Sequence, residues 1–318
     1  GAVLLRNRDG LLPVTKGRIV VCGPNSELVA KGGGSGEVFP FVTSSIAQGM
    51  KKNLGRKLHF GSTPDLWKTD LTVFYADSAC TVRGAAAEVL NKPDLPGEPV
   101  QRSGWRSIGY KGWESPVPGV VNADNYSDRY TFYFKPEQDA VLYFSAGGDD
   151  GYRLLIDGEE LIEQWYSHPF RQKEGFRKFE GGRLYRITYE HFDGGSEQET
   201  MFRYADYLND PVFFEAVRTA DAVVVCVGYD WYLESESWDR PFALPEGHLY
   251  CLESVLEHTD KAVVVINSGG GVEMAPWLDR TGGVLMAWYQ GQRGGDAIPG
   301  LLTGKVSRVG NLPFTLDR

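Results

Sequence analysis

The chain has 318 residues, which is enough for two domains of ordinary size. With 42% hydrophobic residues, it can bury a sizeable core. Its formal net charge of −9 argues against nucleic acid and anionic membranes as partners, because both attract basic surfaces. No run approaches the roughly 18 apolar residues of a membrane-spanning helix. Aromatic residues make up 13% of the chain, as expected for a β-rich core or for surfaces that stack on sugars.

The start of the chain, "GAVLLRNRDGLLP", lacks the long apolar segment and cleavage site of a signal peptide. That absence says little about export, and we favour a periplasmic or extracellular location. The four cysteines form no CxxC pair and the five histidines no HxxxH or HExxH pattern, so we predict no metal site and no cofactor. Cys22 and Cys226 lie in Val-rich runs, where we expect reduced, buried thiols.

The first predicted strand covers residues 18–23, "RIVVCG", a short continuous apolar run. Such a run is typical of a strand buried on both faces of a parallel sheet. Two segments after it invite a phosphate-binding interpretation. However, "GPNSEL" does not have the order GxGxxG, and "KGGGSGE" does not have the order GxxxxGK[ST]. We therefore predict no phosphate-binding loop in either segment.

Residues 65–210 have a different pattern of apolar and polar residues. The runs "DRYTFYFKP", "AVLYFSAGG", "YRLLIDGEEL" and "GRLYRITYEHF" alternate apolar and polar residues, with turn residues between them. The pair Asp157-Gly158 is a hairpin turn signal. The pattern predicts an antiparallel β-sandwich inserted between a first part, 1–64, and a second part, 211–318, of one outer domain.

After the insert, three apolar runs predict buried strands at 221–228, 261–268 and 282–288. Between the first two, "LPEGHLYCLESVLEHT" has apolar residues at helical spacing after a Pro-Glu start. A second helix is predicted at "GGDAIPGLLTG", although Pro299 interrupts its pattern. Strands that alternate with helices predict an α/β fold, here a three-layer α/β/α sandwich with a mainly parallel sheet.

The segment that follows the strand at 221–228 is rich in charge. The sequence "YLESESWDR" brings three acids, an arginine and two aromatic rings to the carboxyl end of a strand, where α/β folds place ligands. These residue types suit a catalytic loop, in which a neighbouring carboxylate or burial raises the pKa of a general acid. The alternative is a pair of solvated loop acids, which is how most exposed glutamate pairs behave.

The outer segments resemble glycoside hydrolase family 3, specifically its second, α/β-sandwich domain. The resemblance is carried, in the family's usual order, by "AVLLRNRDGLLPV", "RIVVCGPNS", "GGGSGEVFP", "GYDWYLESESWDRPFALPEG", "VVVINSGGGVEMAPW", "VLMAWYQGQRGGDAI" and "GNLPFTL". It implies that residues 32–36 form a tight loop beside the active-site cleft and that Gly33, Gly34 and Ser35 contact substrate.

The resemblance also implies a missing partner. Family members usually contain a (β/α)8 barrel that carries the aspartate nucleophile and most of the residues that hold the sugar. No part of this sequence resembles that barrel, so we expect it in a separate chain or elsewhere in a longer protein. The sequence also leaves a homo-oligomer open.

The family's acid commonly lies in a pattern like E-G-x-D-R. Aligned on Asp239 and Arg240, that acid falls on Glu236, with serine where glycine is usual. Glu234 is the alternative, because the spacing in this loop varies across the family. We expect Glu234 to repel charge on Glu236 and Trp238 to desolvate it, which would raise its pKa. Asp239 and Arg240 are expected to form an ion pair that anchors the loop.

The insert resembles a PA14 domain, a β-sandwich often involved in carbohydrate recognition. The resemblance is carried by "GGDDGYRLLIDGEELIEQW". In adhesin-type PA14 domains the acids corresponding to Asp149 and Asp150 help to bind Ca²⁺ and sugar, so both are candidate substrate-binding residues, as is Trp165. The alternative is that the acid pair accepts backbone hydrogen bonds at turns and that the aromatic side chain packs in the core.

Together these features predict part of a retaining exo-β-glycosidase, most simply a β-glucosidase that acts on β-linked oligosaccharides or glycosides. Retaining enzymes use two carboxyl groups about 5 Å apart. This chain would supply the general acid/base, and the barrel would supply the nucleophile. A β-xylosidase or a β-N-acetylglucosaminidase is an alternative, because the residues that distinguish these sugars lie mostly in the barrel. A non-catalytic carbohydrate-binding module is the alternative from another class.

Overall fold

The computed structural model describes residues 1–36, 38, 40–53, 58–60, 67–95, 97–195, 198–231, 233–237, 239–307 and 309–316. These residues belong to two compact units, one formed by 1–66 with 210–318 and the other by 67–209. We call them the outer unit and the inserted unit. Within the described part of the chain, no helix is long and apolar enough to cross a bilayer.

The outer unit is built on one six-stranded sheet. Its strand order is β1 (Val3–Asn7), β16 (Gly283–Met286), β15 (Ala262–Asn267), β14 (Ala222–Gly228), β2 (Gly17–Cys22) and β3 (Leu58–Phe60). All neighbouring pairs are parallel except β1 with β16. The central strands are the predicted apolar runs, and every residue of β14 and β15 is buried. This agrees with strands covered on both faces.

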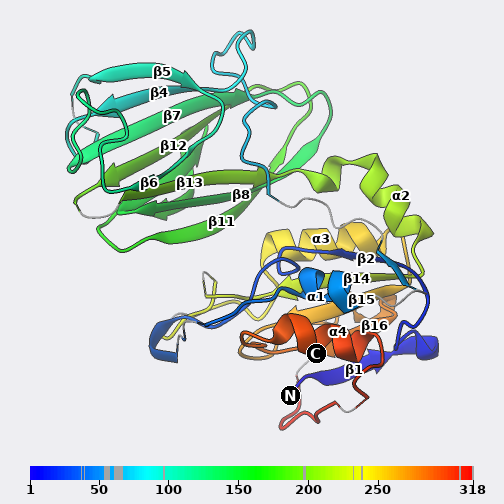
Figure 1. Ribbon diagram of the computed structural model, residues 1–318. Coiled ribbons are helices and arrows are strands. Elements are labelled where there is room, and N and C mark those ends of the chain that lie inside the picture. Colours follow the sequence, from blue (N-terminus) through cyan, green and yellow to red (C-terminus); the bar gives the residue numbers. More distant parts are fainter. Residues whose placement is uncertain are drawn as a thin grey trace. The chain divides into compact units, whose positions relative to one another are not determined.

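Helices cover both faces of this sheet. Helices α1 (Ile46–Asn53) and α4 (Gly294–Leu302) pack together on one face, and α3 (Glu246–Leu256) lies on the other against β14 and β15 (Figure 1). Helix α2 (Pro211–Thr219) contacts β2. One core cluster joins alternate strand residues to α1 and α4 and includes Ile19, Val21, Val224, Val263, Val265, Leu285, Ile46, Met50, Ile298 and Leu302. The predicted α/β fold class is confirmed.

The inserted unit consists of two antiparallel sheets. One has the order β10 (Glu159–Gln164), β9 (Gly151–Ile156), β12 (Tyr185–Asp193), β7 (Tyr126–Phe134), β4 (Ala85–Leu90) and β5 (Gln101–Trp105). The other has the order β11 (Arg171–Phe179), β8 (Ala140–Asp149), β13 (Gln198–Ala205) and β6 (Gly109–Gly112). Residues from both sheets share one aromatic-rich core, which includes Phe132, Tyr189, Phe144 and Phe202. The likeness of this unit to a PA14 domain stays a prediction.

The two ends of the inserted unit lie side by side. The backbone N–H of Lys68 donates to the carbonyl of Tyr204 at 2.7 Å, and the N–H of Tyr204 donates back at 3.0 Å. The ammonium of Lys68 also lies 2.7 Å from the carboxylate of Asp206. The chain therefore enters and leaves this unit at one place, as an inserted domain must.

Deleting residues 67–209 and joining the flanks with a short Gly-Ser linker should leave the outer unit folded, because the deleted ends are close together and the unit has its own core. We expect a soluble product that retains helical circular dichroism and melts cooperatively. Aggregation or loss of the cooperative transition would show instead that the two units depend on a shared core.

Candidate active site

The candidate site begins where β14 ends. The backbone N–H of Gly228 donates to Nδ1 of His248 at 3.1 Å. Burial lowers the pKa of His248 to about 3, so the imidazole is neutral and can accept this hydrogen bond. Gly228 has φ +133°, and a Cβ at this position would lie 1.9 Å from the carbonyl oxygen of Asn267. Glycine is therefore required where the chain leaves the sheet. The segment that follows, residues 229–243, is called the acid loop below.

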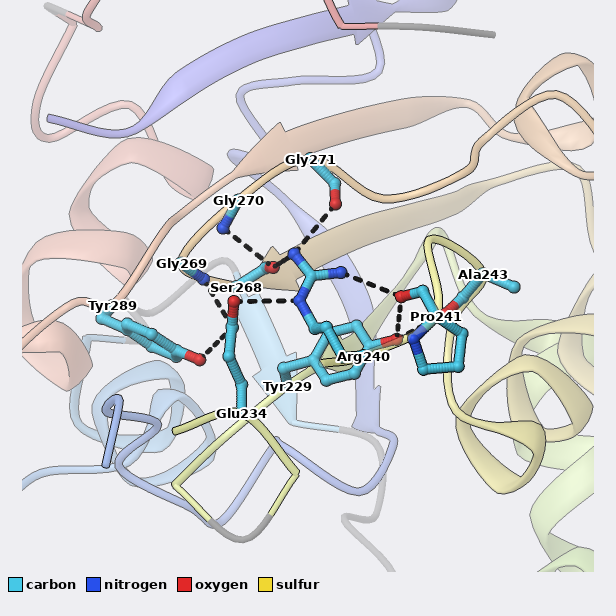
Figure 2. Close-up of polar contacts among 10 residues, drawn as sticks. All are labelled: Tyr229, Glu234, Arg240, Pro241, Ala243, Ser268, Gly269, Gly270, Gly271 and Tyr289. Carbon is cyan, nitrogen blue, oxygen red and sulfur yellow. Dashed lines mark hydrogen bonds and ion pairs between the residues drawn. The ribbon is translucent and has the colours of Figure 1, made fainter. Parts of the chain in front are cut away.

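The carboxylate of Glu234, on this loop, accepts hydrogen bonds from three groups. Its Oε1 accepts from Nε of Arg240 at 2.9 Å, and its Oε2 accepts from the backbone N–H of Gly269 at 2.9 Å (Figure 2). The phenol of Tyr289 also donates to Oε2. Burial alone would raise the pKa of Glu234, but these hydrogen bonds and the nearby guanidinium outweigh it and hold the pKa below its usual range.

This arrangement corrects the predicted anchor of the loop. Among the described residues, the ion pair of Arg240 is with Glu234 and not with Asp239, which is exposed. The guanidinium of Arg240 also donates to Oγ of Ser268 at 3.2 Å and to the carbonyl of Gly271 at 3.0 Å. The expected pairing between adjacent residues was wrong because Arg240 reaches back to an acid six positions earlier. Trp238 lies outside the described residues.

Glu236 is placed differently from Glu234. Its side chain is exposed, and its carboxylate accepts from the backbone N–H of Ser35 at 2.8 Å. Hydrogen bonds from the hydroxyl and the N–H of Ser35 lower the pKa of Glu236. The expected raised pKa is therefore wrong for this chain by itself, since Glu236 is solvated and the charge of Glu234 is directed at Arg240.

The Gly-rich loop, residues 31–36, lies directly against the acid loop. The N–H of Gly33 donates to the backbone carbonyl of Glu234 at 3.2 Å. Gly34 has φ +82°, and a Cβ there would lie 2.4 Å from Cβ of Glu236. The same loop forms one wall of a cavity of about 450 Å³, with Tyr289 and Gln292 on the other. The structure thus brings Gly33, Gly34 and Ser35 together with Glu236, and their contact with substrate stays a prediction.

The acid pair of the inserted unit accepts backbone hydrogen bonds. The carboxylate of Asp150, which is buried, accepts from the N–H of His168 at 3.0 Å and from the N–H of Gly194 at 2.6 Å. The carboxylate of Asp149 accepts from the N–H of Phe170 at 3.2 Å. Burial and the neighbouring carboxylate of Asp150 raise the pKa of Asp149. Both side chains therefore accept backbone hydrogen bonds within the inserted unit, and their contact with substrate stays a prediction.

Trp165 is half-buried at the end of β10. Its ring packs edge-on against Phe192, with centroids 5.0 Å apart, and the guanidinium of Arg153 lies 4.4 Å from its ring centroid. These contacts occupy the ring within the inserted unit.

Among the residues that the structure describes, no group of three or more His, Cys, Asp and Glu side chains is arranged to hold a metal ion.

Sequence reasoning missed Tyr289 and Ser268. Tyr289 follows β16 and Ser268 follows β15, so both lie at the carboxyl edge of the sheet with the acid loop. Their positions at strand ends were the only available signal, because α/β folds gather polar groups there. Glu234 and Tyr289 are 55 positions apart in the sequence, so no local pattern links them.

The fold and the site define an α/β sandwich domain that presents the exposed carboxylate of Glu236 on an anchored loop at the edge of its sheet. The sequence profile of the glycosyl hydrolase family 3 C-terminal domain matches residues 2–318, so the chain belongs to this family. It is 28% identical to a beta-glucosidase from Rhizobium radiobacter and also 28% identical to beta-glucosidase B from Emericella nidulans. Each alignment covers 100% of this chain and 41% of the relative.

Solved structures of beta-glucosidases have a similar fold. DesR, a beta-glucosidase from Streptomyces venezuelae solved with D-glucose, is 21% identical with a TM-score of 0.57, over 96% of this chain and 35% of that protein. A beta-glucosidase from Kluyveromyces marxianus solved with glucose is 21% identical with a TM-score of 0.51, over 96% of this chain and 39% of that protein. The chain thus spans well under half the length of these proteins.

Proposed function

We propose that this chain is the portion of a retaining β-glucosidase that supplies the general acid/base, Glu236. The observation that carries the proposal is the contrast between the two glutamates of the acid loop. Glu234 is held by Arg240, Gly269 and Tyr289, whereas Glu236 is exposed and hydrogen-bonded to Ser35 alone among the described residues. Of these two glutamates, Glu236 is therefore the one whose carboxylate is free to face a substrate bound outside this chain.

The second carboxylate of the mechanism is proposed to come from elsewhere in a longer protein. A retaining glycosidase needs a nucleophile about 5 Å from its acid, and Glu234 is committed to its ion pair. A (β/α)8 barrel carrying an aspartate would meet this requirement. Its approach would bury Glu236 and place a negative charge beside it, and both effects raise a carboxyl pKa. The lowered pKa in this chain alone agrees with a site that is completed by a partner.

In the proposed mechanism, Glu236 protonates the glycosidic oxygen while the barrel aspartate attacks the anomeric carbon. The C–O bond to the leaving sugar breaks, and a covalent glycosyl-enzyme forms. Glu236, now a carboxylate, then takes a proton from water, and the oxygen of that water displaces the aspartate. The substrate is a short β-linked glucoside. β-Xylosides and β-N-acetylglucosaminides are the alternative substrates for the same mechanism.

The isolated 318 residues should show no measurable hydrolysis of an aryl β-glucoside, because they lack a nucleophile, while the protein with its barrel should hydrolyse it. The measurement is release of the aryl alcohol by both proteins, with aryl β-xylosides and β-N-acetylglucosaminides compared in parallel. Turnover by the pure 318-residue chain would refute the division of labour. Sugar binding without turnover by the complete protein would favour the carbohydrate-binding module.

A further inference from the structure

The carboxylate of Glu234 joins three loops at one point. Glu234 lies on the acid loop after β14, Gly269 follows β15, and Tyr289 follows β16. Both of the latter residues donate to Oε2 of Glu234, and Oε1 remains for Arg240 (Figure 2). A single side chain therefore fixes the acid loop relative to the loops that follow β15, the neighbouring strand, and β16, the strand beyond it.

Arg240 closes the acid loop from its other end. Its guanidinium contacts Glu234, Ser268 and Gly271, and it stacks 4.3 Å from the ring centroid of Tyr229. The candidate acid, Glu236, thus lies in the chain between two residues that are paired with each other. A planar, five-donor guanidinium suits this role, because a lysine could not make these contacts at once.

Tyr289 connects this pair of residues, Glu234 and Arg240, with the Gly-rich loop. A Cβ on Gly32 or on Gly269 would lie 3.1 Å from a carbon of the Tyr289 ring, so the ring contacts both loops closely. The Gly-rich loop in turn carries the N–H of Ser35 that binds Glu236. A continuous series of contacts therefore connects the Tyr289 phenol with the position of Glu236.

We propose that Glu234, Arg240 and Tyr289 are positioning residues, which hold Glu236 on Ser35 in the geometry for proton transfer. This inference rests on the proposed function. Proton transfer depends steeply on the distance and alignment of the acid, so a loop that is free to move should weaken acid catalysis before it weakens substrate binding. Tyr289 is the sharpest member to test, since its hydroxyl can be removed while its ring still fills the same space.

In the complete enzyme, Tyr289→Phe and Arg240→Lys should each slow the hydrolysis of cellobiose about tenfold through kcat, with KM nearly unchanged. Formation of the glycosyl-enzyme from a dinitrophenyl β-glucoside should change less than about twofold, because that leaving group departs without a proton. Sites able to react are counted with a fluorinated dinitrophenyl glucoside that traps the glycosyl-enzyme, so misfolded protein does not enter the rates.

Matched controls are Arg280→Lys, which alters an exposed pair with Glu253 at 3.3 Å, and Tyr110→Phe, which removes a phenol that donates to the carbonyl of Glu114. Both controls should leave both substrates unaffected. If Tyr289→Phe and Arg240→Lys lose as much activity on the dinitrophenyl glucoside as on cellobiose, then Glu234, Arg240 and Tyr289 have only a structural role. If neither substrate is affected, these residues have no positioning role.

The proposed function is tested separately by azide rescue of Glu236→Ala. If azide fails to rescue that variant, the assignment of the acid fails. Suppose instead that azide rescues Glu236→Ala, but that Tyr289→Phe and Arg240→Lys slow both substrates equally or neither. Then only the positioning role fails.

Discussion

Replacing Glu236 with alanine in the complete enzyme is expected to slow cleavage of cellobiose by roughly 10²–10⁴. Glucose is a poor leaving group, so the departing oxygen must be protonated as the C–O bond breaks. A dinitrophenolate leaves without a proton, so the first step with a dinitrophenyl β-glucoside should be nearly unaffected. The contrast between the two substrates identifies a lost general acid and separates it from a general loss of folding.

The second half of the reaction gives an independent readout. Without Glu236 no base activates water, so the glycosyl-enzyme should accumulate and a burst of dinitrophenolate should precede slow turnover. Azide needs no deprotonation, and it should restore turnover and yield a β-glycosyl azide.

Glu234→Ala is the matched comparison for this experiment. We expect it to show neither a burst nor azide rescue, because the Glu234 carboxylate is bound to Arg240 and Gly269. Azide rescue of Glu234→Ala but not of Glu236→Ala would transfer the acid role to Glu234. Rescue of neither variant would place the acid outside this loop.

The core strands of the outer unit could be read from the sequence because burial on both faces demands continuous apolar runs. The Val-rich segments became β14 and β15, and Cys22 and Cys226 are buried free thiols as expected. Strand β1 was not predicted. Its residues are mostly half-exposed, and it pairs antiparallel at the edge of the sheet, so its short sequence carries no strong pattern.

The candidate site was only partly predictable, because its contacts join residues that are far apart in the sequence. Adjacent residues in "ESESWDR" indicated a functional loop, but not which acid would be neutralised by Arg240. That choice depends on Gly269 and Tyr289, which approach Glu234 from other strands of the sheet. A sequence pattern reports local spacing, whereas the ion pair follows from tertiary packing, and the pKa of Glu236 depends in addition on a partner outside this chain.

The inserted unit contains a buried acid, Glu190, whose loss should strongly lower the stability of that unit. The carboxylate of Glu190 on β12 accepts from Nε of Arg129 at 2.6 Å and from Nε of Arg153 at 2.5 Å. Its side chain is only 6% exposed. The register places Glu190 directly between Arg129 on β7 and Arg153 on β9, so one carboxylate joins three strands.

Glu190→Ala should destabilise the inserted unit by about 3 kcal/mol, because it leaves two guanidinium groups facing each other with only the carboxylate of Glu88, 3.6 Å from Arg129, as counter-charge. We place the loss at the lower end for a broken buried pair, since the side chains of Arg129 and Arg153 are 35% and 29% exposed and can be partly hydrated. Hydrogen exchange of amides in β7 and β12 reports on this unit, and their slowest exchange should become about 100-fold faster.

The matched control is Glu159→Ala, whose pair with Arg177 spans 3.4 Å and whose side chain is 77% exposed. That control should change stability by less than about 0.5 kcal/mol. Equal effects of the two substitutions would show that the central carboxylate is no more important than a surface charge.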